Sequence, residues 1–518
     1  MAEVELILVS LLVAVVVLSA AARAVNIPYP IVLVVGGLAM GLLPGLPEVE
    51  LEPDLVLVLF LPPLLYSGAF FADLRSLRAD LRAISMLAIG LVLATTVAVA
   101  VVAHAVVDGL PWAAAFALGA IVAPTDPVAA TAIARRLGVP RRIVNTIEGE
   151  SLLNDGTALV AYRVAVTAVG GTFSLLDASV DFVLTASGGI LIGLAAGWLI
   201  VAVRRRIEDP LVETTISLLS GYAGYVPAEQ AGCSGVLAAV TVGIYVGWRA
   251  PVIASPAQRL TGFAVWELLT FLLNALLFVL VGLQLPFILE GLSDQPAGTL
   301  LGQAVLVAIV VTGTRIVWLN TMPYVIRALD RRPSQRARRI GWRPRMISAW
   351  SGMRGAVSLA AALALPLDFP QRDLIVFITF AVILFTLVVQ GLTLPALIAH
   401  LHVELDDAEE REELAARQAA AEAALVRLDE LAEEEWTRTD TAERMRAMYE
   451  YRQRRLAGRV GEGESLEDRS RAYQTMVREV IEAQRGAIVA LRNAGEISND
   501  VMHRLERELD LEDQRLEI

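Results

Sequence analysis

Two short segments place the residue types of a cation site inside long apolar stretches of the chain. In the first, Thr125 and Asp126 lie between two prolines. Each proline removes a backbone donor and opens a helix. The freed carbonyls, the hydroxyl and the carboxylate are hard oxygen ligands. They suit a small monovalent cation, whereas zinc or copper prefers His or Cys. A kinked helix whose aspartate is satisfied by a neighbouring helix is the structural alternative.

The second segment, residues 148–156, gathers polar groups on one side of a predicted helix. At 100° per residue, Ser151, Asn154 and Asp155 share a face, because they stand at positions i, i+3 and i+4. A hydroxyl, an amide and a carboxylate on one stripe of an intramembrane helix need polar partners or water. This stripe is therefore predicted to face the site and not lipid.

Glu150 lies off that stripe and needs a partner of its own, since a buried unpaired charge is unfavourable. Arg354, inside another apolar segment, is the first candidate for a structural ion pair with Glu150. Arg315 is the second candidate and is otherwise assigned a supporting position.

The chemistry expected of Asp155 is exchange. A carboxylate in a partly desolvated cavity is costly to leave charged and bare, so a proton and a cation compete for it. Only a loaded site is close to neutral and crosses the low-dielectric barrier, which gives obligatory antiport. Because the neighbouring Asn154 cannot change its charge, the sequence predicts one proton for one monovalent cation, an electroneutral cycle.

The elements that must position these residues are membrane helices, each of about 20 apolar residues. The sequence is 56% hydrophobic and 19% charged, compared with about a quarter charged in soluble domains. Thirteen spans are predicted, near 4–22, 29–46, 54–71, 83–107, 111–134, 143–168, 182–203, 211–227, 231–248, 262–286, 299–326, 346–366 and 374–400.

The distribution of arginine predicts the orientation of these spans. The odd-numbered loops hold 21 arginines and the even-numbered loops hold one, Arg372. Because positive charge marks cytoplasmic loops, the N-terminus is predicted outside and the C-terminus in the cytoplasm. The expected location is the cell inner (plasma) membrane. The basic loop 327–345 either serves the topology alone, which is the favoured interpretation, or also contacts anionic membrane lipids.

Thirteen spans also divide into two six-span halves of opposite orientation on either side of a seventh span. Helix-breaking residues occur at corresponding places, 123–127 in span 5 and 351–355 in span 12. Interrupted helices in matching positions of two inverted repeats are typical of the binding site of a secondary transporter.

The formal net charge of −12 belongs to the end of the chain. Residues 1–400 hold 25 arginines and 25 acids, whereas residues 401–518 hold 18 arginines and 30 acids. We expect a transmembrane domain at 1–402 and an acidic helical cytoplasmic domain at 403–518, in two helical segments separated by glycines near 458–463. A basic nucleic-acid surface and, with one cysteine, a disulfide framework are excluded.

Several strings resemble the bacterial sodium/proton antiporters of the monovalent cation:proton antiporter-1 family, and they run in order through nearly the whole membrane domain. They are LPPLL at 61–65, APTDPV at 123–128, ESLLNDG at 150–156, SGVLA at 234–238, LN at 273–274 leading to FVLVG at 278–282, and GMRGAVSL at 352–359.

This resemblance implies a homodimer whose crossed broken helices form the ion site. It implies that Asp155 is the principal cation ligand and proton carrier, and that Asp126, Ser151 and Thr125 complete a Na+ site. It also implies that Asn154 beside Asp155 marks the electroneutral branch, and that Glu150 pairs with Arg354. Many relatives carry a glutamate shortly after LPPLL, where this chain has Ser67, a supporting oxygen that cannot titrate.

The sequence therefore predicts an all-α polytopic membrane protein of about 13 transmembrane helices, with two inverted repeats and a helical tail. Its predicted function is antiport of Na+, or Li+ or K+, against H+ for pH and sodium homeostasis, without enzymatic activity or a cofactor. An intramembrane aspartyl protease would also need two membrane aspartates, and a cation channel would need a continuous pore. A peptide-cleavage assay and single-channel recording distinguish these alternatives.

Overall fold

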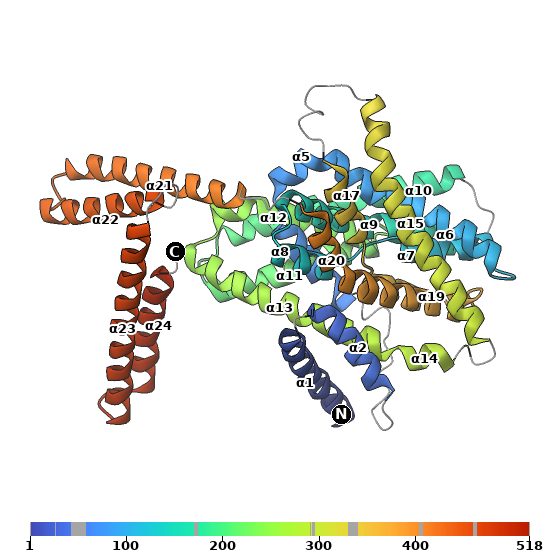
Figure 1. The fold of residues 1–518 in the computed structure, drawn as a ribbon, viewed down its shortest axis with the longest axis horizontal. Coiled ribbons are helices and arrows are strands. Elements are labelled where there is room, and N and C mark those ends of the chain that lie inside the picture. The colour runs from blue at the N-terminus through green and yellow to red at the C-terminus, as the bar shows by residue number, and fades with distance from the viewer. Residues whose placement is uncertain are drawn as a thin grey trace. The chain divides into compact units, whose positions relative to one another are not determined.

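The computed structural model describes residues 2–25, 27–42, 58–169, 175–290, 292, 296–329, 340–403, 408–458 and 464–516. The regular elements of these residues are α-helices and two π-helical segments (Figure 1). The chain divides into two compact units, Met1–Asp406 and Asp407–Ile518.

The first unit contains the long apolar helices. Its elements are α1 (Ala2–Ala24), α2 (Tyr29–Gly41), α4 (Leu61–Phe70), α5 (Leu74–Ser85), η1 (Met86–Leu91), α6 (Val92–Val106), α7 (Trp112–Val122), α8 (Val128–Arg136), α9 (Arg141–Val169), α10 (Leu175–Arg204), α11 (Pro210–Gln230), α12 (Gly235–Ile253), α13 (Pro256–Leu283), α14 (Leu285–Glu290), α15 (Ala297–Leu329), α17 (Trp342–Trp350), α18 (Ala356–Leu363), α19 (Arg372–Phe385), η2 (Thr386–Gln390) and α20 (Gly391–Leu401).

Six stretches of helix in the described part of the chain are long and apolar enough to cross a membrane. They are Leu74–Val106, Val180–Arg204, Gly235–Ile253, Pro256–Leu283, Ala297–Arg327 and Arg372–Leu401. Shorter apolar helices include Tyr29–Gly41 and Trp112–Val122. The count of thirteen spans and the inverted repeat stay predictions, because helix breaks and internal charges keep several predicted spans from forming one long apolar helix.

Both predicted helix breaks are present. The α7 helix ends at Val122 and α8 begins at Val128, so the proline segment between them is not helical. The α17 helix ends at Trp350 and α18 begins at Ala356, so the glycine segment is not helical either. The two non-helical segments meet, because the Asp126 N–H donates to the Met353 carbonyl over 2.8 Å.

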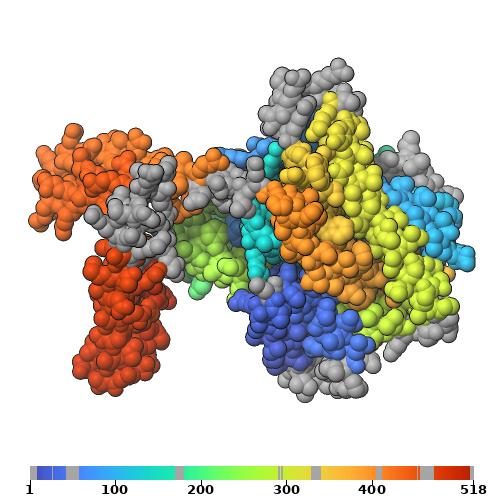
Figure 2. Space-filling view, in the orientation of Figure 1, coloured from blue at the N-terminus to red at the C-terminus, as the bar shows by residue number. Residues whose placement is uncertain are grey.

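The α13 helix is held in place by close backbone contact with α2. A Cβ atom on Gly37 of α2 would lie 2.3 Å from the Val279 carbonyl oxygen of α13. A Cβ on Gly282 would lie equally close, 2.3 Å, to the Val34 carbonyl oxygen of α2. Small residues that let helix backbones touch are a membrane packing device. Figure 2 shows α1 and α2 side by side at this face.

The second unit consists of two helical hairpins (Figure 1). The α21 helix (Ala408–Ala432) pairs with α22 (Thr439–Gly458), and α23 (Glu464–Asn493) pairs with α24 (Asn499–Leu516). The predicted division near 458–463 coincides with the end of α22 at Gly458 and the start of α23 at Glu464, but each of the two predicted segments consists of two helices and not one. The second turn includes Gly495, whose φ of 76° is a left-handed conformation that glycine adopts at helix ends.

Candidate ion-binding site

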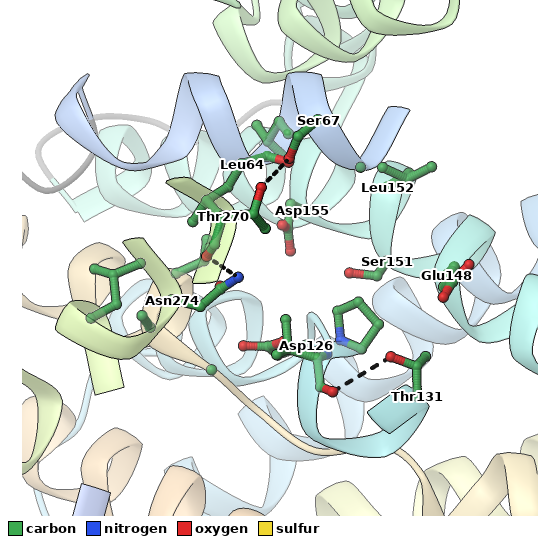
Figure 3. Close-up of a pocket in the computed structure, with 18 of the residues that line it drawn as sticks. Leu64, Ser67, Asp126, Thr131, Glu148, Ser151, Leu152, Asp155, Thr270 and Asn274 are labelled. Carbon is green, nitrogen blue, oxygen red and sulfur yellow. Dashed lines mark hydrogen bonds between the residues drawn. The ribbon is translucent and has the colours of Figure 1, made fainter. Parts of the chain in front are cut away.

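A cavity of about 670 Å3 opens beside the first helix break. Its walls come from α4, α8, α9, α13 and the start of α18 (Figure 3). One end includes the ion pair of Arg135 and Glu148, which joins Nη2 and Oε1 over 2.6 Å and leaves both side chains partly exposed. Besides the aromatic Tyr29 and Trp266, the polar lining residues are Ser67, Thr125, Asp126, Thr131, Arg135, Glu148, Ser151, Asp155, Glu267, Thr270, Asn274 and Ser358.

The α9 helix supplies a buried polar pair to this lining. Ser151 and Asp155 are one turn apart, are only 8% and 7% exposed, and point into the same space (Figure 3). A hydroxyl oxygen and a carboxylate at this spacing present two hard ligands to one cation.

Asn154 lies behind the cavity and not on its wall. It is fully buried, and its Nδ2 donates to the Thr125 hydroxyl over 2.9 Å and approaches the Thr125 carbonyl at 3.5 Å. The predicted polar stripe of α9 is thus divided. Two of its members face the cavity, and the amide instead fixes the first helix break against α9.

Asp126 occupies the cavity wall from the break itself. Its Oδ1 accepts the Val128 N–H over 2.9 Å and so caps the N-terminus of α8. Its other oxygen lies against Gly355 of the second break, where an added Cβ would come within 1.9 Å of it. Asp126 and Asp155 therefore reach one cavity from two separate elements (Figure 3).

Thr125 lines the same cavity, but its hydroxyl is already used. Thr125 Oγ1 donates to Glu150 Oε1 over 3.3 Å and accepts from Asn154. This hydroxyl connects the cavity wall to a buried charged group. Of the predicted Na+ ligands, Thr125 is the one whose side chain is hydrogen-bonded to two other buried side chains, Glu150 and Asn154.

Glu150 pairs with Arg315 of α15, which corrects the prediction of a pair with Arg354. Both side chains are about 1% exposed, and the guanidinium binds both carboxylate oxygens, Nη2 to Oε2 over 2.9 Å. Arg315 also donates to the Ser348 carbonyl through Nε and Nη2. A two-point guanidinium–carboxylate contact satisfies both groups at once in a buried site.

Arg354 instead satisfies backbone carbonyls. Its Nε donates to the Val122 carbonyl over 3.0 Å and its Nη1 donates to the Gly352 carbonyl. Its own N–H donates to Thr386 Oγ1 in the π-helical segment η2. Because the last carbonyls of a broken helix lack intrahelical partners, Arg354 is held by the end of α7 and is not available to Glu150.

The facing wall contains residues that the sequence interpretation did not assign to the site. Thr270 and Asn274 of α13 point into the cavity (Figure 3). Thr270 Oγ1 donates to Ser67 Oγ over 3.4 Å, and Ser67 donates to the Leu64 carbonyl over 3.0 Å. A lone amide inside an apolar span was the available signal for Asn274, but the sequence does not say which way it faces.

The described residues thus define a class: a helical membrane protein in which two broken helices meet at a cavity lined by carboxylate and hydroxyl oxygens. This is the arrangement of a secondary ion transporter.

The comparisons with known proteins give the family. The chain belongs to the sodium/hydrogen exchanger family, whose profile, "Sodium/hydrogen exchanger, transmembrane", matches residues 8–400. A Na+/H+ exchanger of Mycobacterium tuberculosis is 36% identical over 98% of this chain and 96% of its own length. A Na+/H+ antiporter of Aphanothece halophytica is 36% identical over 78% of this chain and 76% of its own length.

A solved structure shows the same fold. The sodium proton antiporter of Methanocaldococcus jannaschii superposes with a TM-score of 0.60 at 20% identity, over 78% of this chain and all of that one. Together with the family match, this makes the chain a multi-pass membrane transporter that exchanges cations for protons.

Proposed function

We propose that this chain exchanges one Na+ for one H+ across the plasma membrane, electroneutrally, in the service of pH and sodium homeostasis. The observation that supports this most directly is the meeting of Asp155, Ser151 and Asp126 in one cavity where two broken helices touch. The related antiporter of Aphanothece halophytica is named for Na+ and H+, which makes Na+ the first cation to test.

In this proposal Asp155 carries either ion. A bare cation is ligated by the carboxylates of Asp155 and Asp126 and by the Ser151 hydroxyl, whereas a proton binds one carboxylate oxygen of Asp155. The two ions exclude each other because each neutralises the same charge. Asn154 beside Asp155 is neutral at every physiological pH and is committed to Thr125, so it adds no second charge to the cycle.

The supporting residues act by holding this site in shape. Glu150 and Arg315 neutralise each other behind it, and Ser67 ties α4 to α13 through hydroxyl groups. We further propose the homodimer, the inverted repeats, the outside N-terminus and the cytoplasmic C-terminus, on the basis of the family resemblance and the arginine distribution in the loops.

Dequenching of a pH-sensitive dye in everted membrane vesicles tests the exchange. We expect Na+ to dissipate an imposed proton gradient with the wild type and not with Asp155→Asn, and Li+ and K+ added separately define the selectivity. Asp73→Asn is the matched control, because Asp73 lies outside the cavity and asparagine also caps helices. Exchange by Asp155→Asn at the wild-type rate would refute the proposed role.

Electroneutrality is tested separately in proteoliposomes. A one-to-one exchange moves no net charge, so the Na+-driven proton flux should not change when a membrane potential is imposed. A transport current that reverses with membrane potential alone would contradict the stoichiometry, but not the exchange itself.

A further inference from the structure

The α13 helix presents its own polar stripe to the ion cavity. Glu267, Thr270 and Asn274 stand at positions i, i+3 and i+7, which is one face of a helix, and all three line the cavity. The α13 helix as a whole is long and apolar enough to cross a membrane. Polar groups on one face of such a helix have no packing role against lipid and need a partner in the cavity.

The opposite wall has the same spacing with a different end group. On α9, Glu148, Ser151 and Asp155 also stand at i, i+3 and i+7 and line the cavity. Each stripe therefore runs from a carboxylate through a hydroxyl to a buried group. That buried group is a carboxylate on α9, whereas on α13 it is the amide of Asn274.

The amide of Asn274 is held in a fixed orientation. Its side chain is only 8% exposed, and its Nδ2 donates to the Thr270 carbonyl over 2.9 Å. With the nitrogen committed to its own helix, the oxygen is the group left to accept a partner. Among the hydrogen bonds formed by the described residues, none ends on this oxygen.

The neighbouring hydroxyls on this side of the cavity donate their protons to other groups of the wall. Thr270 donates to Ser67, and Ser67 donates to the Leu64 carbonyl. Asn274 Oδ1 is therefore a neutral amide oxygen on the wall facing Asp155 and Asp126, and it has no partner among the hydrogen bonds of the described residues (Figure 3).

We propose that Asn274 contributes to the affinity for the cation and not to proton transport. Its Oδ1 is a ligand for the bare cation and takes no part in carrying the proton. This inference rests on the proposed function, and it adds a residue from the wall opposite the carboxylates. An amide oxygen does not titrate, so it strengthens cation binding without altering the one-to-one balance of charge. A proton needs only one carboxylate oxygen, whereas a small cation needs several oxygens at once.

Steady-state exchange in everted vesicles tests this with Asn274→Ala. We expect the apparent KM for Na+ to rise about tenfold, the size of a lost contact to a charged group, with the maximal rate little changed. Because the proton then competes better, exchange at a fixed Na+ concentration should shift to higher pH.

The matched control is Asn320→Ala. Asn320 lies on α15, and its Nδ2 makes the same bond to the carbonyl four residues earlier, Ile316, over 2.9 Å. It does not belong to the cavity lining. Its replacement should leave the KM for Na+ at the wild-type value, which separates a ligand from an amide that only satisfies its own helix.

Asn274→Asp provides a second, independent measurement, because it keeps an oxygen in place. We expect it to bind Na+ at least as tightly as the wild type and to introduce a dependence of transport on membrane potential. A wild-type KM in Asn274→Ala, or a KM in Asn274→Asp as high as in Asn274→Ala, overturns the inference. If the wild type itself shows no exchange, or Asp155→Asn is fully active, the proposed function fails instead.

Discussion

Each of the two broken helices is interrupted by a short non-helical segment, but the charged residue in one segment is an aspartate and in the other an arginine. The break between α7 and α8 contains prolines and a carboxylate, Asp126, which faces the cavity. The break between α17 and α18 contains glycines and a guanidinium, Arg354, which is 1% exposed and donates to backbone carbonyls. One break thus presents a charged side chain to the cavity, whereas the charged side chain of the other binds backbone carbonyls of the protein.

This difference explains how a membrane unit tolerates two helix breaks. Each break leaves backbone groups without helical partners, and such groups cannot be solvated by lipid. Asp126 caps the start of α8, Arg354 binds the end of α7, and Met353 accepts the Asp126 N–H. The second break therefore supplies hydrogen-bond partners for backbone groups of the first break. The carboxylate of Asp126 remains at the cavity wall.

The largest expected effect is on stability, and it tests which arginine forms the ion pair with Glu150. Glu150→Gln leaves Arg315 as an uncompensated buried charge, and we expect a loss of about 3–5 kcal/mol of stability. Arg315→Met in the same chain should restore most of it, since replacing both partners of a buried pair is often neutral. Melting temperatures of the purified protein in detergent measure both.

Double-mutant cycles show directly which of the two arginines interacts with Glu150. The cycle of Glu150 with Arg315 should show a coupling of several kcal/mol, whereas the cycle of Glu150 with Arg354 should show little. The reverse order would return Arg354 to the ion pair and would remove the distinction between the two breaks.

The next effect tests the contact between the breaks. A Cβ added to Gly355 would lie 1.9 Å from Asp126 Oδ2 and 2.6 Å from its Cβ, so the whole side chain must move. We expect Gly355→Ala to lower the exchange rate about 100-fold, the cost of misplacing a reacting group by about an ångström. The rate is measured by dye dequenching, normalised to folded protein.

Gly313→Ala on α15 is the control for this substitution. A Cβ at Gly313 meets no atom within 4 Å, so its replacement should leave exchange intact. Wild-type exchange by Gly355→Ala would show that Asp126 does not need the second break to hold its position.

Much of this arrangement is visible in the sequence, because the residues that cause it act locally. Pro124 and Pro127 break a helix wherever they stand in its interior, and the glycines of 351–355 do the same less strictly. The spacing of Ser151 and Asp155 likewise requires a common face. The helix breaks and the common orientation of these two α9 residues were therefore predictable without any knowledge of neighbouring helices.

The rest depends on contacts between segments far apart in sequence. Arg315 and Arg354 are both arginines in apolar spans, and only the three-dimensional packing shows that Arg354 reaches Val122 while Arg315 reaches Glu150. Asn154 belongs to the predicted stripe, yet its amide donates to Thr125 of the first helix break and does not face the cavity. Helical periodicity gives the direction of a side chain, but it does not say what lies in that direction.

The smallest effect concerns Asp73, which makes the same local contact as Asp126 without a cavity. Asp73 Oδ1 accepts the Arg75 N–H over 2.9 Å and caps α5. Asp73→Ala should cost about 1 kcal/mol and leave exchange unchanged, whereas Asp126→Asn should keep its cap and lose exchange. The Ser76 hydroxyl and the Arg75 N–H hold the pKa of Asp73 below its usual value.

A carboxylate with a lowered pKa stabilises the folded state above its unfolded pKa, and that stabilisation is lost as the pH falls. The difference in melting temperature between the wild type and Asp73→Ala should therefore be full at neutral pH and shrink below about pH 4. Exchange by Asp126→Asn at the wild-type rate would mean that capping, and not the charge presented to the cavity, is what the first break contributes. Each of the two aspartates accepts the backbone N–H two residues later, but the second oxygen of Asp73 accepts from the Ser76 hydroxyl, whereas that of Asp126 lies against Gly355 at the cavity.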